Sequence, residues 1–90
     1  MPSLRHDFGK RLKAIRAERE LTQEEFAELV GISVDFLSLI ERGINSPRFE
    51  VLEQMADRLD VPVRELFDFR KMRGAGAARL PRQTRATKPK

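Results

Sequence analysis

Few side chains in this 90-residue sequence could carry covalent or metal chemistry. The chain has no cysteine and one histidine, His6, so it offers no thiolate nucleophile and none of the cysteine and histidine clusters that bind transition metals. Catalysis needs a reactive group beside a partner that activates it, and no such arrangement stands out in the sequence. We therefore expect no enzymatic activity, no cofactor and no metal ion.

The charged side chains, in contrast, are numerous and unevenly distributed. Residues 1–69 hold 10 Lys and Arg against 14 Asp and Glu, whereas residues 70–90 hold 8 Lys and Arg and no acidic residue. The overall charge of +4 therefore combines a segment of −4 with a tail of +8. A basic tail of low hydrophobicity is typical of a disordered segment that can bind a polyanion, although a solvated run of charge is the alternative.

Two short helices joined by a tight turn are predicted in the centre of the acidic segment. Thr22 and Glu25 have the spacing of a capping box, which starts a helix that runs to about Val30. Gly31 follows where a left-handed residue would end that helix, and Ser33 can cap the next one, expected over residues 34–42. The turn between the two helices is therefore very short.

Three further helices are expected around this pair, and no run of residues alternates like a strand. The first covers residues 4–19, with Leu4, Phe8, Leu12 and Ile15 in one apolar stripe. Another is expected to begin with Ser46 as its N-cap and Pro47 at its first position. Its inner face would carry Phe49, Leu52, Met55, Ala56 and Leu59. A short fifth helix would begin at Pro62 and close the core with Val63, Leu66 and Phe67.

The predicted fold class is therefore all-α. We expect a compact five-helix domain over residues 4–69, followed by a disordered basic tail over residues 70–90. A domain of this size buries only about 60% of the surface that its unfolded chain exposes, so a partner subunit would add stability.

A pair of helices joined by a three- or four-residue turn can place its second helix in the major groove of DNA, although an ordinary helical hairpin has the same outline. Three stretches add detail, in this order: Leu-Thr-Gln-Glu-Glu-Phe-Ala-Glu-Leu-Val-Gly-Ile-Ser (residues 21–33), Leu-Ser-Leu-Ile-Glu-Arg-Gly (37–43) and Ser-Pro-Arg-Phe-Glu-Val-Leu (46–52). Through them, residues 12–67 resemble the Cro/C1-type (XRE) helix-turn-helix domain of phage repressors and bacterial controller proteins. The resemblance implies sequence-specific DNA binding and transcriptional regulation.

The resemblance also implies positions for contacts to DNA phosphates. Gln23 is placed at the start of the first helix of the pair, where free backbone N–H groups and the helix dipole suit an anion. Arg16 and Glu41 match a pair that joins the first helix of the domain to the recognition helix. An exposed ion pair contributes only about 0–1 kcal/mol, so we expect Arg16 to serve a phosphate contact rather than stability. The other expected phosphate contacts are Arg42, Asn45 and Arg48.

Base reading is expected on the outward face of the recognition helix, over residues 34–42. With Leu37 and Ile40 turned inward, that face presents Val34, Asp35, Ser38 and Leu39. Many relatives have Arg, Lys or Gln at these positions, so this chain departs from the family pattern. Leu39 and Val34 can contact a thymine methyl group, whereas Asp35 can accept from a cytosine amine or simply stabilise its own helix. Sequence-dependent DNA shape is therefore expected to supply much of the specificity.

A homodimer is expected, because the end of the domain holds more apolar side chains than a short helix can bury. These are Val63, Leu66, Phe67 and Phe69. Two-fold symmetry would set the two recognition helices about 34 Å apart on a pseudo-palindromic operator. The alternative is that Leu66 and Phe67 close the core of a monomer and Phe69 begins the tail.

The expected partner is double-stranded DNA, and RNA is disfavoured because the chain has no Tyr or Trp for base stacking. The main rival from another class is an antitoxin-like module that neutralises a partner protein through the basic tail and regulates its own operon. The lack of a long apolar segment or a signal-like N-terminus favours a cytoplasmic protein that does not enter a membrane.

Overall fold

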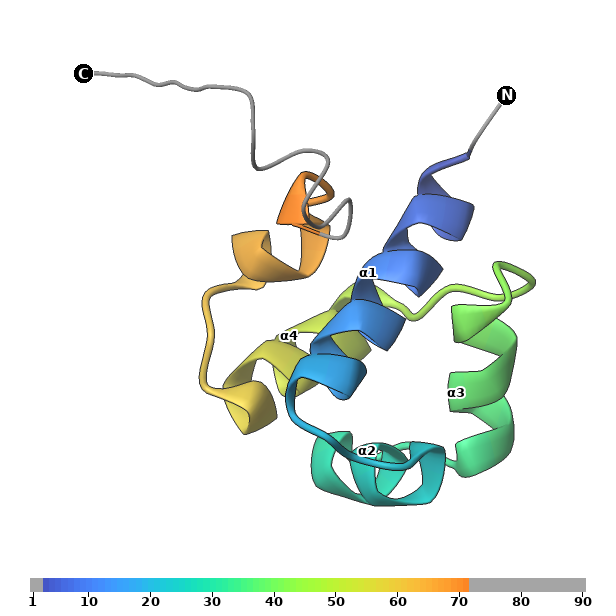
Figure 1. The fold of residues 1–90 in the computed structure, drawn as a ribbon, viewed down its shortest axis with the longest axis vertical. Coiled ribbons are helices and arrows are strands. Elements are labelled where there is room, and N and C mark those ends of the chain that lie inside the picture. The colour runs from blue at the N-terminus through green and yellow to red at the C-terminus, as the bar shows by residue number, and fades with distance from the viewer. Residues whose placement is uncertain (1–2, 72–90) are drawn as a thin grey trace.

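The computed structural model of the chain describes residues 3–71. Over this range four α-helices are followed by one short 3-10 helix (Figure 1). They are α1 (Leu4–Glu18), α2 (Gln23–Val30), α3 (Val34–Glu41), α4 (Phe49–Leu59) and the 3-10 helix η1 (Val63–Phe67). The predicted all-α class is confirmed for the described part of the chain, whereas the expected fifth helix is a 3-10 turn, as is common in so short a piece. Residues 72–90 of the predicted tail lie outside the described residues.

The ends of α2 and α3 are set by local interactions, as predicted. Thr22 and Glu25 form the complete capping box, in which the Thr22 hydroxyl accepts from the Glu25 N–H at 3.1 Å and the Glu25 carboxylate accepts from the Thr22 N–H at 2.9 Å. Gly31 ends α2 with φ +83°, a left-handed conformation that costs other residues energy. The Ser33 hydroxyl then accepts from the Phe36 N–H at 3.0 Å and starts α3.

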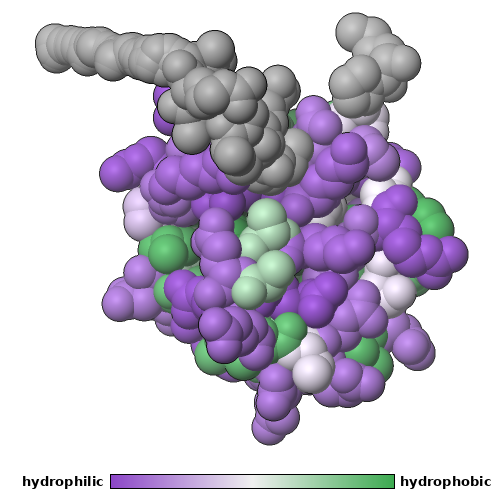
Figure 2. All heavy atoms as spheres, in the orientation of Figure 1, coloured by the Kyte–Doolittle hydropathy of each residue, from purple (hydrophilic) through white to green (hydrophobic). Residues whose placement is uncertain are grey.

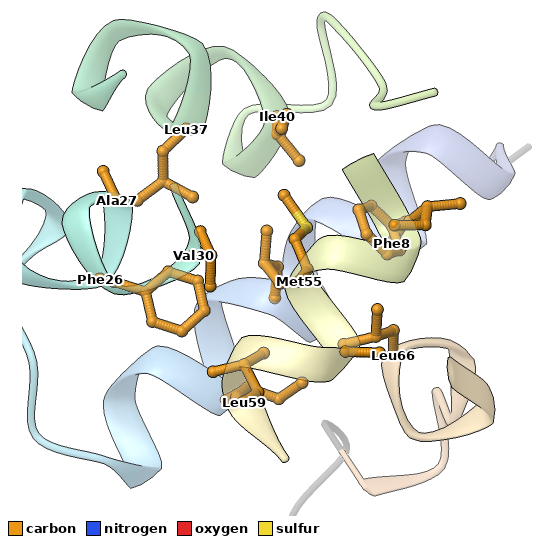
Figure 3. Packing of buried hydrophobic residues seen from close by; sticks show 13 residues of the cluster. Phe8, Phe26, Ala27, Val30, Leu37, Ile40, Met55, Leu59 and Leu66 are labelled. Carbon is orange, nitrogen blue, oxygen red and sulfur yellow. The ribbon is translucent and has the colours of Figure 1, made fainter. Parts of the chain in front are cut away.

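The core lies where the inner faces of all five elements meet (Figure 3). Leu37 and Ile40 of α3 point toward Val30 of α2 and Met55 of α4, and all four are fully buried. Leu66 extends from η1 toward α4 and is also fully buried. Fully burying a side chain of this size contributes about 1.5–3 kcal/mol, so the small domain depends strongly on these contacts.

Close packing between α1 and α3 fixes where the second helix of the pair lies. α3 packs against α1 and α2, while η1 packs against α1 and α4. Gly9 of α1 stands at the crossing with α3, and a Cβ atom there would overlap the carbonyl oxygen of Ile40. A glycine at this position therefore lets the two backbones approach each other.

The start of α4 differs from the sequence-based prediction. Residues 45–48 are not helical, the N-cap is Arg48 instead of Ser46, and its side chain makes no capping hydrogen bond. Phe49, expected in the core, is 82% exposed. The reason is that the first turn of α4 projects past the edge of the core, beside the first turn of α1, where Leu4 is also exposed.

The surface of this small domain is mainly hydrophilic on the face shown in Figure 2, with hydrophobic patches between the polar groups. Within residues 3–71, no helix combines the length and apolar character needed to cross a membrane. The same part of the chain contains no group of three or more His, Cys, Asp or Glu side chains arranged to hold a metal ion.

Candidate nucleic-acid interface

The helical pair α2 and α3 is joined by three residues, Gly31, Ile32 and Ser33. The turn is held from inside by α4, because Gln54 Nε2 donates to the carbonyl oxygens of Val30 at 2.7 Å and Gly31 at 3.2 Å. A Cβ atom on Gly31 would meet this amide at 2.5 Å. The angle between α2 and α3 is therefore fixed by side chains from a third helix as well as by the turn itself.

One face of α3 is buried and the other is accessible. The structure confirms that Leu37 and Ile40 point inward. Asp35 is exposed, while Val34, Ser38 and Leu39 are half-buried. Half-burial leaves part of each of these three side chains accessible on the outer side of the helix.

Glu41, at the last position of α3, joins three elements through its carboxylate. Arg16 of α1 donates to it twice, from Nε to Oε2 at 2.8 Å and from Nη2 to Oε1 at 3.0 Å. Gln23 of α2 donates from Nε2 to the same Oε1 at 3.0 Å. The Glu41 side chain is only 3% exposed and that of Arg16 is 17% exposed. The expectation that this is an exposed ion pair is therefore wrong.

The shared carboxylate also fixes the charge and orientation of Arg16. Its hydrogen bond to Glu41 raises the pKa of the guanidinium. A third N–H group, on Nη1, donates to the Leu21 carbonyl at 3.2 Å. Because a guanidinium has five N–H groups, two of them remain for another acceptor.

The sequence did not predict the contact between Gln23 and Glu41, since the two residues are 18 positions apart and no local pattern joins them.

Next to this cluster, the first turn of α2 offers backbone donors. The first N–H groups of a helix have no partner within it, and the Thr22 hydroxyl satisfies only that of Glu25. Those of Gln23 and Glu24 point along the helix axis together with the positive end of the dipole. The Arg16 guanidinium, the Gln23 amide and this helix end therefore form a group of N–H donors of the kind that binds a phosphate.

A loop with two exposed cations and one exposed amide follows α3. Arg42, Asn45 and Arg48 are all exposed, and within residues 3–71 their side chains make no hydrogen bond. The loop backbone is ordered by the Leu39 carbonyl, which accepts from the N–H groups of Ile44 at 2.9 Å and Asn45 at 3.3 Å. These three side chains therefore project from a loop that is anchored to the end of α3.

The residues expected at a dimer surface fall into two groups. Leu66 is fully buried in the core of the monomer, so it cannot contact a partner without unfolding η1. Val63 is 42% exposed, and Phe67 and Phe69 are half-buried. Phe67 packs against the Phe8 ring at a centroid distance of 5.1 Å and against Phe69 at 6.2 Å. Only Val63, Phe67 and Phe69 therefore retain accessible apolar surface.

Ion pairs hold the segment after η1. Lys71 Nζ lies 2.6 Å from Glu65 Oε1, and Arg70 Nε lies 3.1 Å from Asp68 Oδ1. These hydrogen bonds, from Lys71 to Glu65 and from Arg70 to Asp68, lower the pKa of the two carboxyl groups. Glu65 is also anchored inside the domain, because its backbone carbonyl accepts from Arg11 Nε at 2.8 Å.

A helical pair joined by three residues, a second helix with an accessible outer face and a group of N–H donors beside it define a helix-turn-helix DNA-binding domain of the XRE type. Comparison with known proteins agrees. The chain belongs to the family described as "Helix-turn-helix" (HTH_3), which matches residues 12–66.

Three relatives illustrate the similarity. Over 59 residues the chain is 41% identical to the uncharacterized HTH-type transcriptional regulator YazB of Bacillus subtilis, covering 66% of this chain and 86% of YazB. It is 36% identical over 59 residues to the cryptic phage CTXphi transcriptional repressor RstR of Vibrio cholerae, covering 66% of this chain but only 53% of RstR. The fold is also similar to the crystal structure of the restriction-modification controller protein C.AhdI from Aeromonas hydrophila, with a TM-score of 0.64 and 34% sequence identity. The match covers 69% of this chain and 94% of C.AhdI. All three are described as regulators, repressors or controllers.

Proposed function

We propose that this chain is a sequence-specific transcriptional regulator that acts as a homodimer and places α3 in the major groove of a pseudo-palindromic operator. Arg16, Gln23, Arg42, Asn45 and Arg48 contact phosphates. Base edges are read by Val34, Asp35, Ser38 and Leu39. The two copies associate through accessible apolar side chains near the end of the domain, which include Phe67 and Phe69.

The observation that carries this proposal is the shared carboxylate of Glu41. It holds one donor from α1 and one from α2 at the end of α3, the helix that would enter the groove. A phosphate bound by Arg16 and Gln23 would therefore fix the position of α3 relative to the DNA backbone. Contacts of this kind set the register, while the side chains of α3 read sequence.

The outer face of α3 carries no cationic or amide side chain before Arg42, so it has few groups that donate to base edges. Apolar contacts from Val34 and Leu39 favour thymine methyl groups. The rest of the specificity comes from how easily the DNA between the half-sites adopts the shape that the dimer requires.

Selection of bound sequences from a random DNA library with the full chain tests the proposal. We expect two inverted half-sites whose centres are about 10 base pairs apart, one turn of the double helix. Leu39→Ala should change the selected half-site, because its side chain touches bases. Gln23→Ala should weaken binding to the same half-site, because its amide touches a phosphate. The absence of any enriched sequence would refute DNA reading, and an unchanged site for the Leu39 variant would refute the assigned reading face.

The antitoxin-like alternative depends on the basic tail, most of which lies outside the described residues. An antitoxin of this kind would select the same operator, so the selection experiment cannot distinguish the two functions, whereas deletion of the tail can. Deletion of the tail would leave an antitoxin unable to bind its partner protein, whereas a regulator without such a partner would lose only DNA affinity.

A further inference from the structure

The most exposed large apolar side chain of the described domain is Phe49, at the first position of α4. It is 82% exposed, and Leu4 on the first turn of α1 is 63% exposed. Single exposed apolar residues are common on protein surfaces, but an apolar side chain next to an apolar hollow marks a contact site.

Phe49 is part of the lining of such a hollow. A groove of about 280 Å³ opens between the first turns of α1 and α4, and most of its exposed lining is apolar. We call this the Phe49 groove, and its lining residues are Leu4, Arg5, Phe8, Ser46, Pro47, Phe49, Leu52 and Phe67. Phe67 belongs both to this groove and to the apolar surface at the end of the domain.

We propose that the Phe49 groove is the centre of the interface between two copies of this chain, with Phe49 of each copy seated in the groove of the other. The inference rests on the proposed dimeric regulator and names the surface that joins its subunits. A projecting ring and an apolar hollow side by side on one chain are self-complementary, which is what a two-fold axis requires. A ring buried at the centre of an interface is also the kind of side chain that dominates binding energy.

The charges around the groove are complementary in the same sense. Arg5 lines the groove on the α1 side. Glu50 and Glu53 are exposed on α4, just after Phe49. A two-fold axis beside Phe49 brings the cationic side of each copy toward the acidic side of the other. Such pairing favours the symmetric arrangement over others, although each exposed pair contributes little energy.

The position of the groove also suits DNA binding by both copies. Arg5 Nη1 lies 3.5 Å from the carbonyl oxygen of Ile44, in the loop that follows α3, and Ser46 of the same loop borders the groove. The groove therefore lies beyond the C-terminal end of α3. A two-fold axis there turns the C-terminal ends of the two α3 helices toward each other and leaves both outer faces free.

Sedimentation equilibrium of the full chain and two variants tests the proposal. Phe49→Ser removes the ring without adding charge, and Val63→Ser is the control because Val63 is also exposed and apolar but does not line the groove. We expect Phe49→Ser to raise the dimer dissociation constant by about tenfold or more, as for a central interface residue, and Val63→Ser to change it by less than about threefold. Circular dichroism should show both variants folded, since neither side chain is buried.

A cysteine provides an independent measurement, because the natural chain has none. Oxidation of Phe49→Cys should give a covalent dimer that still binds the selected operator, whereas Glu28→Cys, exposed on α2, should form no covalent dimer. A dimer that tolerates Phe49→Ser but is weakened by Val63→Ser would overturn this inference and leave the proposed dimer intact. A natural chain that binds its operator as a monomer would overturn both.

Discussion

At the level of single residues, the buried position of Glu41 changes what its partner Arg16 is expected to do. Breaking a buried ion pair leaves an unpaired charge, which costs about 3–5 kcal/mol when the pair is fully buried. Arg16 is 17% exposed and Gln23 still donates to Glu41, so we expect Arg16→Ala to lower the free energy of unfolding by about 2–3 kcal/mol. Loss of DNA binding by this variant would therefore mix two effects.

Arg16→Lys separates them, because lysine keeps the charge but cannot make the two-pronged contact with Glu41. We expect it to lower the free energy of unfolding by about 1 kcal/mol and to weaken DNA binding by about tenfold, since the remaining donors are no longer held toward a phosphate. Thermal melts and binding at fixed salt measure the two changes. Arg58→Lys is the control, because Arg58 donates to the Leu29 carbonyl at the far end of α2. Natural affinity for Arg16→Lys would show that the guanidinium does not hold a phosphate.

At the level of elements, the crossing of α1 and α3 decides whether the donors of α1 reach the end of α3. Gly9 makes that crossing possible, and Gly9→Ala has two opposing effects. Alanine favours an α-helix over glycine by about 1 kcal/mol. Its methyl group, however, would overlap the backbone of α3, and overpacking typically costs 1–3 kcal/mol or more.

We expect the overlap to dominate, because a backbone carbonyl cannot turn away as a side chain can. Gly9→Ala should lower the free energy of unfolding by about 1–2 kcal/mol, which chemical denaturation measures. Ala17→Gly, at an exposed position of the same helix, gives the propensity effect alone. A Gly9→Ala variant more stable than the natural protein would mean that α1 and α3 are not in close contact.

At the level of the whole molecule, an acidic domain must approach a polyanion. We expect the positive charge of the basic tail to offset this repulsion, and the structure indicates where the tail can be truncated. Arg70 and Lys71 pair with Asp68 and Glu65. A truncation that keeps these two ion pairs therefore ends after Lys71. Residues 72–90 still contain six cations and no acid: Arg73, Arg79, Arg82, Arg85, Lys88 and Lys90.

We expect truncation after Lys71 to lower DNA affinity at low salt and to leave the selected sequence unchanged. Each phosphate that a cation neutralises changes the slope of log K against log salt by about 0.9, so the slope should flatten by roughly two to four units per subunit if about half of these cations engage. Fluorescence anisotropy across a series of salt concentrations measures the slope. An unchanged slope would assign the tail to another partner.

The sequence by itself determined the four α-helices, most of their ends and most of their inward faces. The Thr22 and Glu25 capping box, the Gly31 turn and the Ser33 cap each depend on residues at most five positions apart, so a local pattern is sufficient to predict them. The inward positions of Leu37 and Ile40 follow from the period of the helix alone. Even the family could be predicted, because its motifs are local stretches in a fixed order.

Only the tertiary structure decided which surfaces these helices bury. Glu41 collects its donors from residues 18 and 25 positions away, so its burial and its bond to Gln23 depend on how three helices meet. Phe49 has the spacing of a core residue but lies beyond the edge of the core, whereas Leu66, expected at a partner surface, fills it. Helical periodicity states which way a side chain points around its helix axis. Whether another element covers it depends on the lengths and crossing of helices far apart in the chain. This is why the burial of Glu41, its hydrogen bond to Gln23 and the Phe49 groove emerged only from the fold.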